Sequence, residues 1–301
     1  MDESAIINMF FENSKQNPWD DDCALIDGKI LITTDSMSEN IHFRRKWSRP
    51  EDLAIKLFHT NLSDLSCSGG RAEWCLVNLG IPENIKDEST SIFTKTLVKE
   101  ASLYNCKIIG GDTYRSESMQ FTMTMGGKII KRHLARKGGK DSDTLYITGS
   151  PGLSSLGLKI LSKNLRSMPK NLREEALERH LRPRARMEWA HKIAEEKKVH
   201  AGMDLSDGIY QDAEKLARAS GVGLQIDLDK IPLIPGIEKY LTAEEIICGG
   251  EDYEILFLGK AGLSFPFPVT AIGRANSEIS GVAYIKEGSK VDIKFNGFKH
   301  F

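Results

Sequence analysis

Apolar and polar positions along this chain follow the spacing of helices in several segments. Residues 51–65 carry apolar side chains at positions 54, 57, 58, 62 and 65, which is the spacing of one buried helix face. Residues 209–220 repeat that spacing at 209, 213, 216 and 217, and Gly221 follows where a C-terminal cap glycine belongs. Further helices are expected over residues 4–13, 88–104 and 171–198, the last of them broken at Pro183.

Shorter apolar runs between these helices predict strands. Residues 23–26 and 29–35 flank Asp27 and Gly28, and an Asp-Gly turn between two apolar runs is a strong hairpin signal. Further strands are expected over residues 74–79, 107–109, 120–130, 144–148, 200–205, 224–228 and 254–257. We expect Gly126 and Gly127 to interrupt the strand at 120–130, and Asp112 to lie at the carboxyl end of the strand at 107–109. Helices and strands alternate in both halves, which indicates an α/β class of fold.

The length and charge of the chain narrow the classes of function. Its 301 residues are long for one hydrophobic core and suggest two domains, which we place at 1–137 and 138–301, with the boundary in a basic, glycine-containing segment. A net charge of −1 lacks the basic excess of a nucleic-acid or anionic-membrane surface. The sequence has no run of 18 apolar residues, no signal-peptide pattern and no CxxC pair among its five cysteines. We therefore expect a cytoplasmic protein with reduced cysteines and no membrane or nucleic-acid partner.

Acidic residues recur at the ends of the predicted elements, and each has two explanations. The recurring positions are Asp22, Asp35, Asp64, Asp112, Asp204 and Asp207. Asp204 and Asp207 fall at one strand-to-helix corner, where two carboxylates repel each other unless a cation lies between them. The plainer explanations are that Ser206 or Asp207 caps the following helix, that residues 20–22 form a solvated loop, and that Asp112 caps a turn.

The type of these side chains favours magnesium and a nucleotide triphosphate. His and Cys residues lack the ligand spacing of zinc sites, whereas oxygen ligands suit magnesium. Magnesium ions can bridge carboxylates to phosphates and neutralise the charge that develops in phosphoryl transfer. A glycine-rich turn at residues 149–158 is not a P-loop, because the Gly-Lys-Ser/Thr ending is missing.

Seven segments, in the same order and from about residue 20 onward, give the chain a family resemblance. The segments are Asp21-Asp22-Cys23-Ala24, Thr33-Thr34-Asp35, Ile41-His42-Phe43, Asn61-Leu62-Ser63-Asp64-Leu65, Gly110-Gly111-Asp112-Thr113, Asp204-Leu205-Ser206-Asp207-Gly208 and Gly249-Gly250-Glu251-Asp252-Tyr253-Glu254. With these segments the sequence resembles the thiamine-monophosphate kinase family. That family belongs to the superfamily of aminoimidazole ribonucleotide synthetase, selenophosphate synthetase and the hydrogenase maturation protein that dehydrates a thiocarboxamide.

The resemblance implies a fold, an activity and an assembly. The fold would be the two-domain aminoimidazole ribonucleotide synthetase-like fold, with an N-terminal α/β domain built on a mixed sheet and a C-terminal α+β domain. The N-terminal domain would bind ATP and magnesium and form a homodimer through its sheets. The activity would be ATP-dependent phosphorylation of thiamine monophosphate to thiamine diphosphate, by direct, magnesium-assisted phosphoryl transfer.

The resemblance also assigns roles to individual residues. Magnesium ligands would be Asp22, Thr33, Thr34, Asp35, Asp64, Asp112, Asp204 and Asp207. ATP would contact Gly111, Asp112, Arg136 and Ser206, and thiamine monophosphate would contact His42, Glu251 and Phe298. Asp207 and Arg136 would carry the catalysis. One departure from the family pattern is Pro18-Trp19-Asp20, which stands where the family usually has glycine before its paired aspartates.

Two alternatives stay open at this stage. One is a sister enzyme of the superfamily that phosphorylates another acceptor. The sequence lacks the reactive cysteine in a glycine-rich N-terminal loop expected of selenophosphate synthetase, and the C-terminal cysteine expected of the hydrogenase protein. The other alternative is a non-catalytic nucleotide or metal sensor, and the complete set of expected ligands speaks against it.

Overall fold

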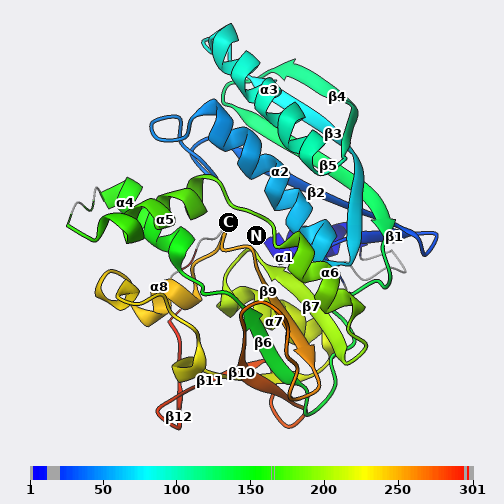
Figure 1. Cartoon of the computed structure of the whole chain (residues 1–301), viewed down its shortest axis with the longest axis vertical. Coiled ribbons are helices and arrows are strands. Elements are labelled where there is room, and N and C mark those ends of the chain that lie inside the picture. The colour runs from blue at the N-terminus through cyan, green and yellow to red at the C-terminus, as the bar shows by residue number, and fades with distance from the viewer. Residues whose placement is uncertain (1–2, 12–20, 164, 166, 295–296, 298–301) are drawn as a thin grey trace. The chain divides into compact units, whose positions relative to one another are not determined.

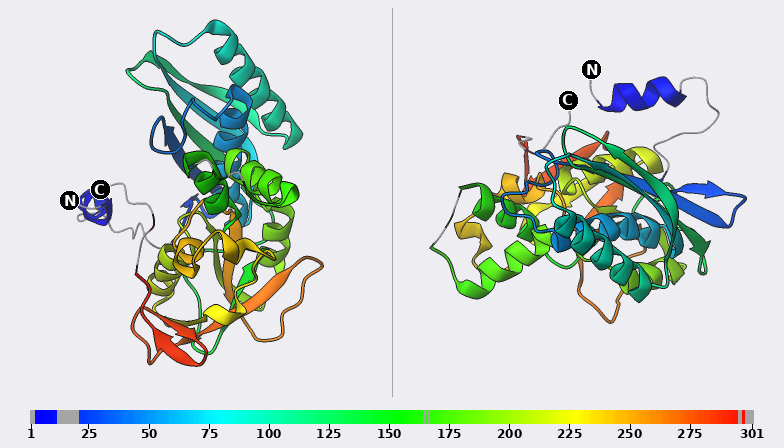
Figure 2. Two further views of the ribbon diagram at one scale, coloured as in Figure 1. Left: turned by 90° about the vertical axis from the view of Figure 1, so that its left-hand side faces the viewer. Right: turned by 90° about the horizontal axis from the view of Figure 1, so that it is seen from above.

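The computed structural model describes residues 3–11, 21–163, 165, 167–294 and 297, and its contacts divide the chain into two compact units (Figures 1 and 2). The five-stranded unit comprises Cys23–His133 and Gly157–Glu195. The seven-stranded unit comprises Met1–Asp22, Leu134–Leu156 and Glu196–Phe301. The predicted domain boundary between residues 137 and 138 stays a prediction.

The five-stranded unit is a mixed sheet with helices along one face. Its strands are ordered β1-β2-β5-β3-β4, with β3 and β4 parallel and the other pairs antiparallel. They are β1 (Ala24–Ile26), β2 (Ile30–Ser38), β3 (Gly70–Ile81), β4 (Lys107–Arg115) and β5 (Gln120–Ile129). The helices of this unit are α2 (Pro50–Cys67), α3 (Asp87–Leu103), α5 (Lys170–Leu181) and α6 (Met187–Glu195). Figure 1 shows α2 and α3 running along the sheet, so the core of the unit lies between these helices and the strands.

Helix α2 is buried on nearly all sides, not only along the one face that its apolar spacing predicts. Leu57, Phe58, Leu62 and Leu65 are fully buried, and polar neighbours such as Asn61 are buried as well. The reason is that α2 packs on the sheet, on α3 and on α6 at the same time. A helix enclosed in this way can hold polar side chains in fixed positions.

The seven-stranded unit carries the second mixed sheet. Its strand order is β12-β11-β8-β10-β6-β9-β7. The strands are β6 (Thr144–Thr148), β7 (Val199–Leu205), β8 (Gly223–Asp227), β9 (Glu254–Gly259), β10 (Val269–Asn276), β11 (Val282–Lys286) and β12 (Ser289–Val291). Its helices are α1 (Glu3–Phe11), α7 (Ile209–Ser220) and α8 (Ala243–Ile247), with short 3-10 turns at Leu228–Lys230 and Ile237–Lys239. Helix α4 (Leu153–Lys163) begins in this unit and ends in the other. The apolar face of α7 packs against β7, with Ile209, Ala213 and Leu216 fully buried.

Elements with local signals in the sequence are confirmed. The hairpin turn lies at Asp27 and Gly28, and both residues have positive φ angles, 50° and 65°, as a tight hairpin turn requires. Helix α7 ends at Gly221, which is left-handed at φ 66°. The predicted helical segment at 171–198 is two helices on either side of Pro183.

Two expectations about strands are wrong. Strand β5 is not interrupted at Gly126 and Gly127 but runs through both, paired with β2 and β3. The ring of Trp74 lies where a side chain of Gly126 would stand, only 2.2 Å from its ideal Cβ position, so this glycine makes room for packing. Asp112 does not end its strand either, because β4 continues to Arg115 and Asp112 pairs with Asn78 on β3.

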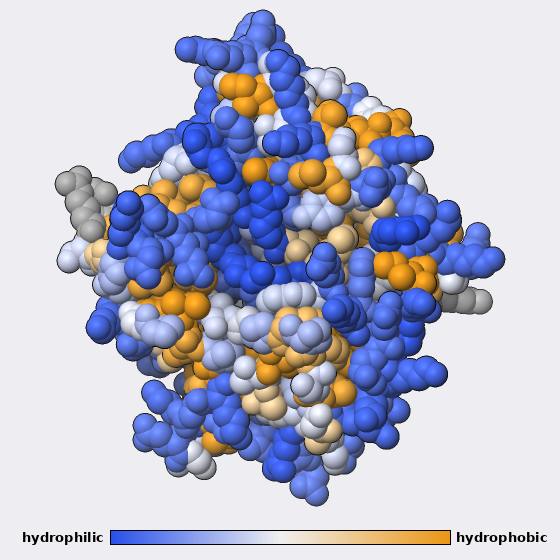
Figure 3. All heavy atoms as spheres, viewed as in Figure 1, coloured by the Kyte–Doolittle hydropathy of each residue, from blue (hydrophilic) through white to orange (hydrophobic). Residues whose placement is uncertain are grey.

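The surface is mostly hydrophilic on the face shown in Figure 3, where hydrophobic atoms form small separate patches. Among the described residues, no helix is both long and apolar enough to cross a membrane.

Candidate active site

A strand-to-helix corner in the seven-stranded unit holds three of the predicted site residues, Asp204, Ser206 and Asp207. Strand β7 ends at Leu205 and α7 begins at Ile209. Neither Ser206 nor Asp207 caps the helix: the N-cap residue is Gly208, at φ 93°, with no side-chain cap bond. The plain capping explanation of this motif is therefore wrong. The carboxylate of Asp207 instead accepts a hydrogen bond from Lys215.

A second glycine turn lies directly against this corner. The backbone N–H of Glu251 donates to the carbonyl oxygen of Ser206 at 2.7 Å, and that of Tyr253 donates to Leu205 at 2.9 Å. A Cβ atom on Gly208 would lie 2.6 Å from the carbonyl oxygen of Gly249. The two turns approach this closely because glycines stand on both sides. Ser206 and Glu251, expected to contact different substrates, are thereby held side by side.

Behind the corner, two residues that the sequence analysis did not single out fix the position of Asp207. The backbone N–H of Asp207 donates to Oδ2 of Asp212 at 2.9 Å. Nζ of Lys215 donates to Oδ1 of Asp212 at 2.8 Å and also to Oδ2 of Asp207. Asp212 is fully buried, whereas the side chain of Asp207 is 52% exposed. One buried carboxylate and one ammonium group thus support one exposed carboxylate.

The charges of this group shift one another's titration. Burial raises the pKa of the Asp212 carboxyl above its ordinary value, and Lys215 opposes that shift. Burial lowers the pKa of Lys215, but the carboxylates of Asp212 and Asp207 outweigh it, so that the pKa of this ammonium lies above its ordinary value. Lys215 is therefore a permanent cation at neutral pH.

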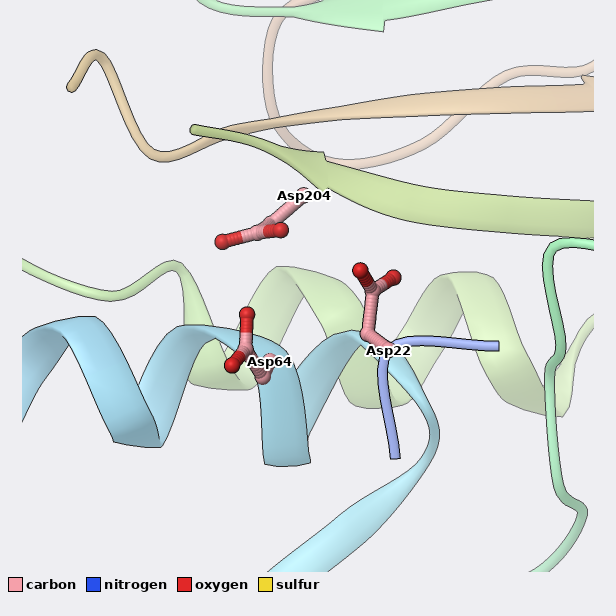
Figure 4. A group of neighbouring side chains, drawn as sticks. All are labelled: Asp22, Asp64 and Asp204. Carbon is pink, nitrogen blue, oxygen red and sulfur yellow. The ribbon is translucent and has the colours of Figure 1, made fainter. Parts of the chain in front are cut away.

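Asp22 and Asp204 form a second acidic group in the same unit. Each contributes a carboxylate oxygen within 4.8 Å of the other, and Figure 4 shows the two carboxyl groups directed toward a common space. Asp204 is fully buried. Oδ2 of Asp22 is buried without a hydrogen-bond partner among the described residues, while Oδ1 accepts a hydrogen bond from Arg136. Close, buried carboxylate oxygens of this kind fit a hard cation such as Mg²⁺.

Arg136 is held by its backbone as well as by Asp22. The hydroxyl of Ser220, at the end of α7, donates to the carbonyl oxygen of Arg136 at 2.8 Å. The same hydroxyl accepts from the N–H of Gly139 at 3.1 Å. Burial lowers the pKa of Arg136 below its ordinary value, although nearby carboxylates, Asp212 and Asp204 first among them, raise it. The guanidinium nonetheless stays charged, because its ordinary pKa is far above neutral.

In the five-stranded unit, β2 and α2 bring together Thr33, Asp35 and Asp64, the last of which is also drawn in Figure 4. The hydroxyl of Thr33 donates to Oδ2 of Asp64 at 2.7 Å. Oδ1 of Asn61, one turn earlier on α2, accepts from the backbone N–H of Asp35 at 3.1 Å. Thr34 differs: because side chains alternate along a strand, its hydroxyl lies on the opposite face, where it donates to the carbonyl oxygen of Met123.

Gly111 and Asp112 lie on β4, at the edge of the same sheet. Asp112 is exposed, and its backbone N–H donates to Oδ1 of Asn78 at 2.9 Å. Its carboxylate accepts from the N–H of Thr113, which is a local contact with no second acidic residue. Within the described part of the chain, Asp112 is thus not gathered with Asp35 or Asp64 by any such contact.

Two of the three residues expected at thiamine monophosphate are described. Nδ1 of His42 accepts from the backbone N–H of Ser38 at 3.0 Å, which places the proton of the neutral ring on Nε2. Glu251 has φ 68°, a left-handed conformation stabilised by its bond to Ser206. Phe298 lies outside the described residues.

Sequence reasoning gave no role to Asp212, Lys215 or Asp252, although Asp252 stands in one of the seven segments that carry the resemblance. Asp252 is buried and accepts from the N–H groups of Gly152 at 2.7 Å and Ser154 at 3.2 Å. The Asp252 carboxylate therefore accepts hydrogen bonds from backbone N–H groups at the N-terminus of α4, in the glycine-rich turn at 149–158. A signal for Asp212 existed, because it interrupts the apolar stripe of Ile209, Ala213 and Leu216 with a charge.

Comparison with known proteins places this geometry in a family. Residues 20–129 match the model of the AIR synthase related protein, N-terminal domain, and residues 140–278 match the C-terminal domain. The thiamine-monophosphate kinase of Leptospira interrogans is 40% identical over 285 residues, which cover 93% of this chain and 92% of that protein. The chain belongs to the thiamine-monophosphate kinase family.

Solved structures agree with this membership of the thiamine-monophosphate kinase family. The structure described as AaThiL complexed with AMPPCP and TMP superposes with a TM-score of 0.89, at 31% identity over 100% of this chain and 97% of that one. HypE of E. coli, a hydrogenase maturation protein, shares the fold at a TM-score of 0.72 and 16% identity, covering 98% of each chain. The two-domain AIR synthase-related fold, α/β with mixed sheets, is confirmed.

Proposed function

We propose that this chain transfers the γ-phosphoryl group of ATP to the phosphate of thiamine monophosphate, giving thiamine diphosphate and ADP. The observation that carries the proposal is the likeness, over the whole chain, to AaThiL in complex with AMPPCP and TMP. AMPPCP resembles ATP with a carbon bridge that cannot be cleaved. The 40% identity to the Leptospira thiamine-monophosphate kinase supports the same acceptor.

Magnesium is the metal that we propose for the acidic groups. Its ligands would come from Asp22, Thr33, Thr34, Asp35, Asp64, Asp112, Asp204 and Asp207. The support is the oxygen-only donor set and the close carboxylates of Asp22, whose side chain is 5% exposed, and of Asp204, which is fully buried. When bound, magnesium would neutralise charge on the phosphates during transfer. Gly111, Asp112, Arg136 and Ser206 would hold ATP.

Direct transfer is the mechanism that this chain's residues favour. The acceptor phosphate is largely ionised at neutral pH, because its second pKa is about 6 by analogy with phosphoserine, so it needs no general base. What the transfer needs is alignment and positive charge. We assign the positive charge to Arg136 and the alignment to Asp207, as a proposed magnesium ligand, and the anchoring of Arg136 by Asp22 and Ser220 supports that choice.

Direct transfer makes a stereochemical prediction. One in-line displacement inverts the configuration at phosphorus, whereas two displacements through an enzyme group retain it. Isotopically chiral γ-thiophosphate ATP distinguishes the two outcomes. We expect inversion, and retention would exclude the direct mechanism.

The acceptor would bind beside the ATP-binding corner. We assign His42, Glu251 and Phe298 to thiamine monophosphate. The support for Glu251 is its backbone bond to Ser206, an expected ATP contact, because the phosphates of the two substrates have to meet. His42→Ala should raise the KM for thiamine monophosphate several-fold and leave that for ATP unchanged.

Assembly and location are further parts of the proposal. We propose a homodimer formed through the five-stranded sheet, supported by exposed apolar side chains on β3 and β4, namely Leu76, Ile108, Ile109 and Tyr114. Size-exclusion chromatography with light scattering tests it. We propose a cytoplasmic protein, supported by five buried cysteines without disulfides.

One experiment tests the proposed reaction against the alternatives. The protein is incubated with magnesium-ATP and thiamine monophosphate, the products are oxidised to thiochrome derivatives, and the diphosphate is separated from the monophosphate by chromatography and measured by fluorescence. The matched control omits ATP. A sister enzyme with another acceptor would produce no thiamine diphosphate, and a nucleotide sensor would bind ATP without turnover.

A further inference from the structure

Lys215 stands in an unusual place for a lysine, between two carboxylates of the ATP-binding corner. Its Nζ donates to Asp207 and to Asp212, and only 21% of its side chain is exposed. Asp207 is an expected metal ligand, so a divalent cation and this ammonium group would share the same carboxylate.

We propose that Lys215 is a tethered counter-ion that occupies Asp207 until a divalent cation displaces it, and that Asp212 retains the ammonium group when this happens. The inference rests on the proposed function in one respect, namely that Asp207 binds the metal. It makes Lys215 a positioning residue and not a catalytic one. Its effect is to set how tightly the corner binds metal before nucleotide arrives.

The different burial of the two carboxylates gives the exchange its direction. Asp212 is fully buried, and an unpaired carboxylate at such a position is costly, so Lys215 cannot leave it. Asp207 is half exposed and can turn to another cation at little cost. The metal therefore competes with Lys215 for Asp207 only, and not for Asp212.

Local geometry keeps the displaced ammonium group close by. Lys215 and Asp212 lie three residues apart on α7, a spacing that places their side chains on one face. Asp212 also accepts the backbone N–H of Asp207, so the corner keeps its shape when the ion pair opens. The charge of Lys215 stays at the corner throughout the exchange.

If the ion pairs of Lys215 only stabilise the fold, the affinity for metal should respond differently to substitution. Two substitutions distinguish this role from that of a tethered counter-ion. Lys215→Met removes the ammonium group that competes with the metal for Asp207, so metal should bind more tightly, by roughly two- to fivefold, the upper range of exposed ion pairs. Asp212→Asn keeps the acceptor for Asp207 N–H but leaves Asp207 as the only anionic partner of the lysine among the described residues, so metal should bind more weakly by a similar factor. A structural pair would loosen metal binding in both variants.

We measure the binding of Mn²⁺ in the absence of nucleotide and at constant ionic strength. Electron paramagnetic resonance detects the free Mn²⁺ and gives the Kd. Matched controls on the same helix carry the same charge changes: Arg218→Met for the lysine, and Glu214→Gln for the aspartate, because the Glu214 carboxylate accepts from the backbone N–H of Val282. We expect each control to shift the Kd by less than twofold. Lys215→Gln serves if the methionine variant does not fold, and thermal melting checks all variants.

Each outcome decides the matter. Tighter binding in Lys215→Met and weaker binding in Asp212→Asn, both beyond their controls, support the tethered counter-ion. Equal shifts in variants and controls, or weaker binding in both variants, overturn it. Failure of the proposed function looks different, because the wild-type protein would then form no thiamine diphosphate or would bind no Mn²⁺ at all.

Discussion

Two clusters of charged side chains look alike in composition but differ in exposure. In the five-stranded unit, Asp52 accepts from Nε of Arg182 at 2.5 Å, and Glu100 accepts from Arg184 at 2.9 Å. Both carboxylates are almost fully buried, and their arginines come from the segment that joins α5 and α6. In the seven-stranded unit, Lys215 joins a buried carboxylate to one that is half exposed.

The difference indicates which cluster supports the fold and which supports chemistry. The carboxylates of Asp52 and Glu100 have their protein partners and little access to anything else, so they fasten the α5–α6 connection to α2 and α3. Asp207 has a protein partner on one side and solvent on the other. Asp207 can exchange its ammonium partner for a ligand, because solvent reaches its carboxylate. Substitutions in the two clusters should therefore separate activity from stability.

The largest expected effect is on turnover, from Asp204→Asn. This variant keeps the size of the side chain but removes one of two close, buried carboxylates. We expect kcat to fall by at least about 10²-fold, as when one element of charge stabilisation is lost. The melting temperature of the metal-free protein should stay equal or rise, because repulsion from Asp22 decreases. Asp227→Asn, in a partly exposed pair with Lys230, is the control with normal kcat.

The next effect is on stability, from Asp52→Asn in the five-stranded unit. Asp52 accepts from the backbone N–H of Arg49 at 2.9 Å as well as from Arg182, so the variant weakens the start of α2 and the α5–α6 anchor together. We expect the free energy of unfolding in urea to fall by about 1–3 kcal/mol, with kcat unchanged. Lys170→Gln, in an exposed pair with Glu174, should leave both quantities unchanged. A large loss of kcat would make Asp52 part of the active site.

The smallest expected effect is a dependence of stability on pH, which arises from the shifted pKa values of His59 and Glu100. Burial lowers the pKa of His59 below its ordinary 6.5, and the hydrogen bond from His59 lowers the pKa of Glu100 below its ordinary 4.5. A lowered pKa in the folded state gives stability that is complete above the unfolded value and is lost as pH falls toward the folded one. The melting temperature should therefore decrease from about pH 6.5 downward.

A variant isolates the contribution of His59 to that decrease. His59→Gln cannot take up a proton, so its melting temperature should change less between pH 7 and pH 5 than that of the wild type. His133→Gln tests a histidine outside this cluster. If the two variants have the same slope as the wild type, His59 does not control acid stability.

Sequence patterns identified those features that depend on neighbouring residues. The hairpin at Asp27 and Gly28 needs two positive φ angles, which these residue types supply. The end of α7 at Gly221 is equally local. The continuity of β5 through Gly126 depends on Trp74, some fifty residues away, and no local pattern contains that contact.

The candidate site shows the same difference between features set by neighbouring residues and features set by distant contacts. The resemblance gave Asp22 and Asp204 one role, and the structure places their carboxylates close together. The resemblance alone could not place the hydroxyl of Thr34 on the opposite face from Thr33. The bridge from Lys215 to Asp207 depends on the shape of a glycine corner and on the burial of Asp212. Helical spacing gives the contact between 212 and 215 but not the third partner.

The strand order of the seven-stranded sheet bears on how the chain folds while it is being synthesised. Strand β9 lies between β6 and β7, and β6 has β10 on its other side, while β7 has only β9 in the described sheet. Residues 144–148 and 199–205 therefore leave the ribosome before any of their sheet partners has been made. Until residues 254–259 emerge, both strands expose unpaired backbone groups, which are prone to non-native pairing. The strand that carries Asp204 is thus among the segments with most to gain from a chaperone during translation.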